Sequence, residues 1–324
     1  MAHLLEPNVV DDDLVARLQS PDFQVRSIAV RELADEGTEE AVEMLVRALR
    51  DEHAAVREAA VYALDGIEEP DVIAAVITAL EDENPQVRIA AAAAIEDLKN
   101  PQLGPVLLAA VEKQELFVKA SVLRALRGLR LRDSLMPALR ALANADPQVR
   151  RAAISVLGYL QARQALSALI DHAENDEDPE VRRIAVGAIT FSNHPAVGAV
   201  AVTALHDTHW VVREEAAASL GKMQYRPGVN ALIAVMEDPY WQVRQKAAGS
   251  LGKLKDVTAV PILGKAVFHE QSNLRKEAVA ALGEIADPSA QPFLEKACED
   301  IDPDVRKLAA WALKRIAAAS VRSA

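Results

Sequence analysis

The sequence contains few of the residues that stabilise small extracellular folds or membrane proteins. Of its 324 residues, one is cysteine, 13 are glycine and 4% are aromatic. The single cysteine, Cys298, excludes an intrachain disulfide and a metal site built from several cysteines. No apolar run reaches the length of a membrane span, and no basic start followed by an apolar stretch marks a signal peptide. We therefore expect a cytoplasmic protein that does not enter a membrane.

Alanine and leucine are abundant, which favours closely packed helices over sheets and predicts an all-α protein. The net charge is −12, but it is unevenly distributed. Residues 1–100 hold 23 acids and 8 bases (−15), residues 101–170 hold 4 and 10 (+6), and the remainder holds 21 and 18 (−3). This asymmetry predicts a surface with distinct acidic and basic regions.

A Val-Arg dipeptide or a close variant recurs along the whole chain. Successive copies are 31 residues apart, with one step of 32, and a fixed period of this size indicates a repeat array. We expect one array over residues 1–324, with a short lead at 1–10 and a tail at 318–324. The ten copies begin at Val25, Val56, Val87, Val118, Val149, Val181, Val212, Val243, Leu274 and Val305.

Each repeat is predicted to form a helical hairpin. When the valine is counted as position zero, position +4 is alanine in nine of the ten repeats and position +8 is always Leu or Ile, so that 0, +4 and +8 share one helical face. Apolar pairs upstream, such as Leu14 and Leu18, predict a first helix. Asp or Asn followed by Pro before the valine suits the start of the second helix. Glycines after +8 predict left-handed helix ends at Gly66, Gly128, Gly158, Gly221, Gly252 and Gly283.

The repeat "D-P-x-x-x-V-R-x-x-A-A-x-x-L-G" resembles the short HEAT-like repeat of the E/F-type phycobilin lyases and of many bacterial scaffold proteins, over nearly the entire chain. The resemblance implies a right-handed α-solenoid of about ten hairpins whose second helices line the concave surface. It also implies that the arginine at +1 pairs with an aspartate six residues earlier, as in Asp51/Arg57, Asp82/Arg88, Asp176/Arg182, Asp207/Arg213, Asp238/Arg244 and Asp300/Arg306. Lys113, Asn144 and His269 replace that aspartate, so Lys119, Arg150 and Arg275 are expected to lack the usual partner.

A first candidate partner site lies around repeats 4 to 6. Position +6, the expected floor of the groove, is small from repeat 5 to repeat 9, which leaves room for a guest. Two arginines and two rings, Arg151, Arg183, Tyr159 and Phe191, are expected to converge beside this floor at repeats 5 and 6. Such a set would suit an anionic, partly apolar partner. The alternative is that these arginines are solvated and the rings cover helix ends. The residues concerned are Arg124, Arg151, Tyr159, Arg183 and Phe191.

A second candidate site is aromatic. Trp210 and Trp241 are 31 residues apart and stand where other repeats have proline. With His209 and Tyr240 they are expected to form a row on adjacent repeats. The row would serve either packing between repeats or binding of a partner.

Catalysis receives little support from the sequence. The seven histidines show no metal-ligand spacing, no nucleophile or nucleotide-binding motif occurs, and Cys298 falls at a core position where a buried thiol is expected. We predict a non-enzymatic scaffold or adaptor that has no cofactor of its own and binds a protein client in its concave groove. This role includes assisting the maturation of a client that carries a cofactor.

Two other functions stay open at this stage. The resemblance leaves a phycobilin lyase subunit as an enzymatic alternative, in which Arg151, Arg183, Tyr159 and Phe191 would hold the tetrapyrrole. A lesser alternative is nucleic-acid binding by the basic residues of the middle segment. These are Lys119, Arg124, Arg127, Arg130, Arg132, Arg150 and Arg151.

Overall fold

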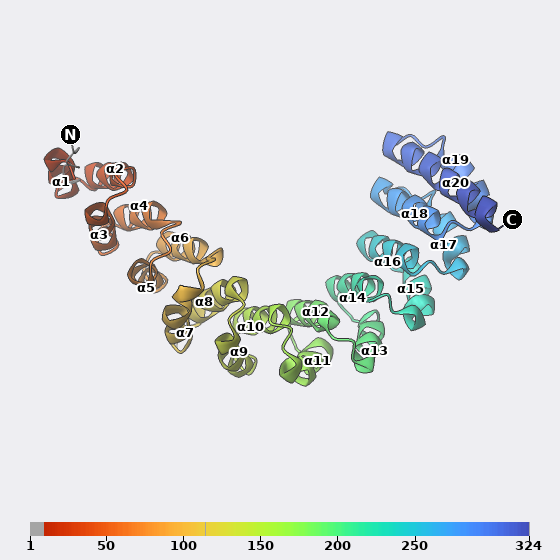
Figure 1. The fold of residues 1–324 in the computed structure, drawn as a ribbon, viewed down its shortest axis with the longest axis horizontal. Helices are drawn as coiled ribbons and strands as arrows, with labels where there is room; N and C mark the ends of the chain where they lie inside the picture. Colours follow the sequence, from red (N-terminus) through yellow and green to blue (C-terminus); the bar gives the residue numbers. More distant parts are fainter. Residues whose placement is uncertain (1–9, 114, 324) are drawn as a thin grey trace, which may run out of the picture. The chain divides into compact units, whose positions relative to one another are not determined.

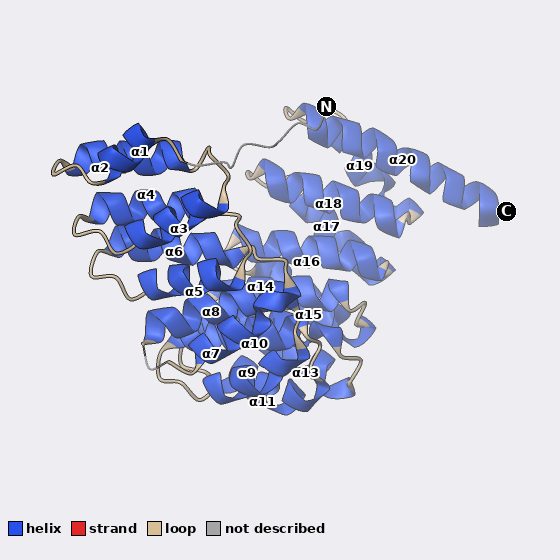
Figure 2. Ribbon diagram, turned by 60° about the vertical axis from the view of Figure 1, so that its left-hand side comes forward, coloured by secondary structure: helices blue, strands red, loops and turns tan. Residues whose placement is uncertain are grey.

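A computed structural model of the chain describes residues 10–113 and 115–323. In this part of the chain every regular element is a helix, as Figure 2 shows. The first helices of the hairpins are α1 (Asp12–Leu18), α3 (Glu39–Ala48), α5 (Pro70–Ala79), α7 (Gly104–Val111), α9 (Leu135–Ala141), α11 (Leu166–Asn175), α13 (Pro195–Ala204), α15 (Val229–Ala234), α17 (Val260–Ala266) and α19 (Gln291–Ala297).

The second helices carry the Val-Arg dipeptides and are longer than the first helices in every repeat except the sixth, where both have ten residues. They are α2 (Phe23–Leu33), α4 (Ala54–Leu64), α6 (Pro85–Glu96), α8 (Leu116–Leu129), α10 (Pro147–Tyr159), α12 (Pro179–Ala188), α14 (Trp210–Lys222), α16 (Trp241–Leu254), α18 (Ser272–Ile285) and α20 (Pro303–Ser323). Short 3-10 helices are η1 (Pro101–Leu103), η2 (Arg132–Ser134), η3 (Arg163–Ala165), η4 (Ile189–Phe191), η5 (Arg226–Gly228), η6 (Val235–Glu237), η7 (Val257–Ala259) and η8 (Pro288–Ala290).

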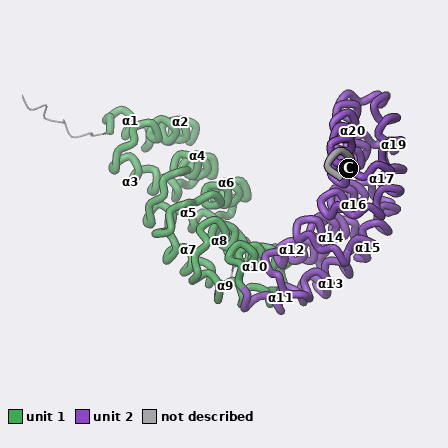
Figure 3. The backbone as a smooth tube through the Cα atoms, turned by 45° about the vertical axis from the view of Figure 1, so that its right-hand side comes forward, with its two compact units in different colours: residues 1–162 green, residues 163–324 purple. Residues whose placement is uncertain are grey.

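The hairpins divide into two compact units, residues 1–162 and residues 163–324, which Figure 3 distinguishes by colour. Each unit contains five hairpins, and within each unit the first helices form one layer and the second helices another (Figure 1). The predicted lead at 1–10 lies outside the described residues except for Val10. Within the predicted tail at 318–324, α20 continues as a helix through Ser323.

The core follows the predicted helical face. Val118, Val122 and Leu126, at positions 0, +4 and +8 of α8, are completely buried, and the equivalent positions of most other repeats are buried too. The helix starts are also capped as the sequence predicts. Asp146, which precedes Pro147 at the start of α10, accepts a hydrogen bond from the backbone N–H of Gln148. The sequence thus builds an all-α solenoid in which each hairpin buries its apolar face against its neighbours.

The glycines have a different role from the predicted one. Among the six, only Gly66 has a left-handed backbone, at φ +85°. Gly252 lies inside α16, where a Cβ atom would come 2.7 Å from the Cα of Ala281 on the next second helix. Non-glycine residues with a left-handed backbone follow five of the second helices instead, and they are Arg130, Gln161, Gln224, Lys255 and Ala286. Glycine is therefore needed at Gly252 for close approach of two helices.

Candidate partner-binding site

Arginines at position +1 join consecutive repeats. Arg57 donates from Nε to Asp82 Oδ2 over 2.6 Å and from Nη2 to Asp82 Oδ1 over 2.8 Å. This two-pronged geometry is the strongest arrangement of a guanidinium and a carboxylate. The partner is 25 residues later, in the following repeat, and we call each such pair a rung. Within the described parts of the two units, rungs join Arg26–Asp51, Arg57–Asp82, Arg182–Asp207, Arg213–Asp238 and Arg275–Asp300.

The predicted pairing with the aspartate six residues earlier is wrong for the side chains. Arg57 reaches that residue, Asp51, only through its backbone, with Nη1 donating to the carbonyl oxygen over 2.8 Å. The expectation that Arg275 lacks an aspartate partner is wrong as well. Arg275 forms a rung with Asp300, and Arg150 donates to the carbonyl of Asn144 over 2.9 Å. The +1 arginine therefore fixes its own turn and the next repeat together.

Ionisation of the rungs follows from their contacts. The hydrogen bond from Arg57 holds the pKa of Asp82 below its ordinary value, and the backbone N–H of Asn84 acts in the same direction. Both side chains are 9% exposed, so the pair is largely removed from water. A charge pair in this position is costly to break from one side, because the remaining charge stays buried.

Three places in the row of rungs lack the acid. Lys113 stands opposite Arg88, Asn144 opposite Lys119, and His269 opposite Arg244. His269 Nε2 lies 2.8 Å from Arg244 Nη2, and its Nδ1 accepts from the backbone N–H of Gln271. Since a neutral imidazole has one acceptor nitrogen, it cannot accept both hydrogen bonds. The buried Nε of Arg244 has no hydrogen-bond partner among the described residues, so this contact is weaker than a rung.

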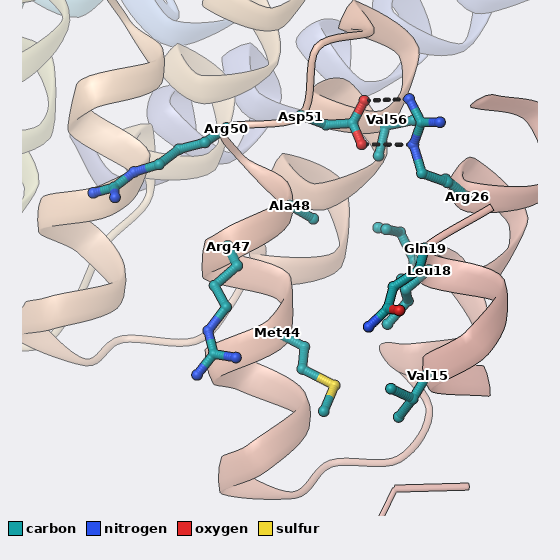
Figure 4. A pocket seen from close by; sticks show the side chains of 11 residues that line it. Val15, Leu18, Gln19, Arg26, Met44, Arg47, Ala48, Arg50, Asp51 and Val56 are labelled. Atoms are coloured by element: carbon teal, nitrogen blue, oxygen red, sulfur yellow. Dashed lines mark hydrogen bonds and ion pairs between the residues drawn. The ribbon is translucent and has the colours of Figure 1, made fainter. Parts of the chain in front are cut away.

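Small clefts open beside the rung positions, between successive first helices. The cleft beside Arg26–Asp51 measures about 290 Å³. Figure 4 shows the two dashed hydrogen bonds at one side of it and Met44 pointing toward Val15 across it. Comparable clefts lie beside Arg182–Asp207, at about 610 Å³, and beside Lys119 and Asn144, at about 170 Å³.

Tyr159 ends α10 and is 50% exposed. The guanidinium carbons of Arg127 and Arg130, at the end of α8, each lie 5.5 Å from its ring centroid. Arg124, one turn earlier, donates to the Ser121 hydroxyl over 2.9 Å, and burial lowers its pKa. The ring is therefore held in place by two cations while part of it stays open to solvent.

The predicted convergence of Arg151 and Tyr159 with Arg183 and Phe191 stays a prediction, because the first two belong to residues 1–162 and the others to residues 163–324. Arg151 is half-buried on α10 and donates to the Pro147 carbonyl. Arg183 donates to Glu180 over 2.8 Å and lies 3.9 Å from Glu215. Its charge is thus balanced within the chain. Phe191 is half-buried at the end of η4.

Glutamates of the next repeat fill the space beside two of the small +6 residues. A Cβ atom on Gly187 would lie 2.8 Å from Glu215, and one on Gly249 would meet Glu277. Burial raises the pKa of the Glu277 carboxyl above its ordinary value. The small floor at these two repeats accommodates the chain's own side chains.

The aromatic row contains one stack. The rings of Trp210 and Tyr240 are 5.4 Å apart at 12°, and the guanidinium of Arg213 lies 5.8 Å from the Tyr240 centroid. His209 is exposed beside them, and Trp241 is half-buried with no stacked ring among the described residues. We call His209, Trp210, Tyr240 and Trp241 the aromatic row. Its central contact joins Trp210 to Tyr240 of the following repeat.

Exposed apolar side chains lie on the second helices of the first three repeats; of these, only Tyr62, at position +6, falls on the expected floor of the groove, and none was expected to bind a partner. Ile28, Tyr62 and Ile89 are more than half exposed. Their positions, +3, +6 and +2, lie away from the buried face, and that offset was the available signal. Cys298, expected in the core, is half-buried at the end of α19.

The described residues contain no group of three or more His, Cys, Asp or Glu side chains that could hold a metal ion. Among their helices, none combines the length and apolar character needed to cross a membrane.

Comparisons with solved structures show the same fold. An engineered protein is 20% identical, with a TM-score of 0.52 and coverage of 94% of this chain and 98% of that one. The E. coli protein YibA is 15% identical, with a TM-score of 0.52 and coverage of 90% and 96%. Yeast importin-beta is 14% identical, with a TM-score of 0.63; the match covers 94% of this chain and 50% of importin-beta, so the chain spans about half of that protein.

Sequence comparisons identify the repeats themselves. No curated protein matches the chain significantly. The PBS lyase HEAT-like repeat matches residues 212–238, which is one repeat. The profile of HEAT repeats matches residues 12–81, 55–127, 133–221 and 229–314. These matches cover most of the sequence with the same unit that the hairpins and rungs display, and the chain therefore belongs to the HEAT-repeat family.

Proposed function

We propose that this chain is a non-enzymatic scaffold that binds a protein client, with the aromatic row as an anchor point. The observation that carries the proposal is Tyr240, which is 45% exposed while Trp210 and Arg213 hold its ring in place. A preformed aromatic surface loses little conformational freedom on binding. Trp, Tyr and Arg are also the residues that most often dominate protein interfaces.

Tyr159 supports the same function at a second place, because it too is an exposed ring fixed by two arginines. Solenoids of this fold are suited to clients, since each added repeat extends the surface without requiring a larger core. Yeast importin-beta, whose fold is similar, is described as binding RanGDP. For the present chain we propose a client that makes aromatic and cation contacts.

We favour a scaffold over a tetrapyrrole lyase because of Arg183. A propionate-binding arginine needs an available cation, and Arg183 is engaged by Glu180 and Glu215. The single PBS lyase HEAT-like match concerns residues that stack the repeats. Titration of the purified chain with a linear tetrapyrrole is expected to leave the pigment's absorbance spectrum unchanged, and a saturable spectral shift would support the lyase.

Quantitative affinity capture tests the scaffold. Immobilised wild-type chain, Trp241→Ala and Phe268→Ala are each exposed to native lysate, and captured proteins are measured by mass spectrometry. Phe268 is a matched control, being an exposed ring at another place in the second unit. The client's recovery should fall about tenfold or more with Trp241→Ala, as expected for a hot-spot residue. Equal recovery with all three chains would contradict the proposal.

A further inference from the structure

The row of rungs is interrupted at two consecutive places in the first unit. Opposite Arg88 stands Lys113, and opposite Lys119 stands Asn144. We call these four residues the ladder gap. In a complete rung the acid lies 25 residues after the arginine and receives both prongs of the guanidinium. In the ladder gap the cations of two successive repeats face residues that carry no negative charge.

Arg88 is held ready for a carboxylate. Its Nη1 donates to the carbonyls of Asp82 and Glu83 over 2.8 and 3.1 Å, which is the contact that Arg57 makes in its rung. The Nε and Nη2 edge, which receives the aspartate elsewhere, forms no hydrogen bond or ion pair with the described residues. Lys113 in the acid's place pairs with Glu81 over 2.8 Å.

Lys119 is in the same situation one repeat later. Its ammonium forms no ion pair within the described part of the chain, and it lines the cleft of about 170 Å³ together with Asn144 and Arg140. Asn144 keeps the local role of the missing aspartate, because its Oδ1 accepts from the backbone N–H of Asp146 over 2.9 Å. What it lacks is the charge. The cleft's own acid, Glu112, pairs with Arg140.

The charges at the ladder gap do not cancel. Lys113 with Glu81 and Arg140 with Glu112 are neutral pairs, which leaves Arg88 and Lys119 without an ion pair of their own among the described residues, although the Arg88 charge also acts on the nearby Asp82 carboxylate. Lys119 lies in residues 101–170, where 10 bases outnumber 4 acids, whereas Arg88 lies in residues 1–100, where 23 acids outnumber 8 bases. From this geometry we infer that the ladder gap binds an acidic segment of a partner protein, whose carboxylates take the places of the two missing aspartates.

The spacing restricts the partner's conformation. Arg88 and Lys119 occupy equivalent positions in the first turns of α6 and α8, and packed neighbouring helices are roughly 8–10 Å apart. In a polyproline II helix, residues three apart project to the same side and are separated by about 9 Å. In a β-strand, residues three apart point to opposite sides. A partner segment in polyproline II conformation with acids at positions i and i+3 matches this spacing.

A synthetic peptide provides the test. A fluorescein-labelled peptide with the sequence Asp-Pro-Pro-Asp-Pro-Pro is titrated with the full chain at low ionic strength, and anisotropy is recorded. The control peptide, Asp-Asp-Pro-Pro-Pro-Pro, has the same composition and charge. We expect the spaced peptide to bind about tenfold more tightly, since only it reaches both cations. Equal binding of the two peptides, or no binding of the spaced one, would overturn the inference.

Three variants locate the binding. Asn144→Asp supplies an internal acid to Lys119, so it should weaken peptide binding about tenfold while raising the melting temperature, a combination that misfolding cannot produce. Lys119→Gln should weaken binding to a similar extent. Arg132→Gln removes an exposed cation of the same basic segment outside the ladder gap, and binding should change less than about twofold. An equal loss with Arg132→Gln would mean that only diffuse positive charge is involved.

The acidic partner must also be distinguished from a nucleic acid. Single-stranded oligothymidylate of matched charge should compete with the spaced peptide poorly. Tighter binding of the oligonucleotide, lost in Lys119→Gln, would overturn the inference in favour of a phosphate backbone. The ladder gap shares no residue with the aromatic row, so its outcome is independent of the proposed client anchor.

Discussion

Arg57 and Asp82 are 25 residues apart in the sequence, and their side chains meet in two hydrogen bonds of 2.6 and 2.8 Å that connect consecutive repeats. The same guanidinium donates to the Asp51 carbonyl in its own turn. One residue type at one position thus fixes the turn within a repeat and the stacking of the next repeat. For this reason the rungs are the first place to test the stability of the array.

Replacing Asp82 with Asn should lower the free energy of unfolding by about 3 kcal/mol, because the buried Arg57 charge then keeps only the exposed Glu83, at 3.5 Å, as an acidic partner. Asparagine keeps the acceptor that caps the backbone of Asn84, so the loss reports the ion pair. The control is Glu43→Gln, which breaks the exposed Arg47–Glu43 pair and should cost less than about 0.5 kcal/mol. Urea denaturation measures both, and equal losses would contradict the importance of the rung.

His269→Asp should complete a rung with Arg244 and raise stability by about 1 to 2 kcal/mol. Burial and then the nearby Arg244 hold the pKa of the His269 imidazole below its ordinary value of 6.5. The unfolded chain therefore takes up a proton that the folded chain resists, and stability falls as pH drops below about 6.5. His269→Asp should remove this part of the pH dependence. Melting curves recorded between pH 5 and 8 provide the measurement. A melting temperature that depends on pH as steeply in His269→Asp as in the wild type would contradict the prediction.

Gly252→Ala should destabilise the second unit by about 2 kcal/mol, because the added Cβ meets backbone of α18 and the helices must separate. Gly128→Ala is the matched control on another second helix. There the nearest atom, Leu98 O, would lie at 3.5 Å, an ordinary contact, so alanine should be tolerated and gain about 0.5 kcal/mol in helix propensity. Thermal unfolding of the two variants should therefore shift in opposite directions. Similar shifts would show that close helix approach does not limit Gly252.

Trp210→Ala and Trp241→Ala should separate packing from partner binding. Trp210 stacks on Tyr240, so its removal costs about 1 kcal/mol for the aromatic pair in addition to the lost apolar contact. Trp241 has no stacked ring among the described residues, so Trp241→Ala should lower the melting temperature less than Trp210→Ala does. Client affinity is expected to fall in both variants. A larger thermal loss for Trp241→Ala than for Trp210→Ala, with client affinity unchanged, would assign Trp241 to packing instead.

The sequence alone determined the period, the hairpins and the buried face, because these depend on residue types that recur at fixed spacings along the chain. Val118, Val122 and Leu126 are buried where a 3.6-residue helix places them. The sequence also marked the places where Lys113, Asn144 and His269 replace an acid. It identified exposed rings at Tyr159 and Tyr240, although not what holds them.

Only the tertiary structure decided which residues meet between repeats. Arg57 has an aspartate six residues before it and another 25 residues after it, and the displacement from one hairpin to the next brings the later carboxylate to the guanidinium. The same displacement places Trp210 on Tyr240 and brings Gly252 against Ala281. Periodicity fixes which positions are equivalent, but the rise and rotation between hairpins, set by side-chain packing, fix which of them touch.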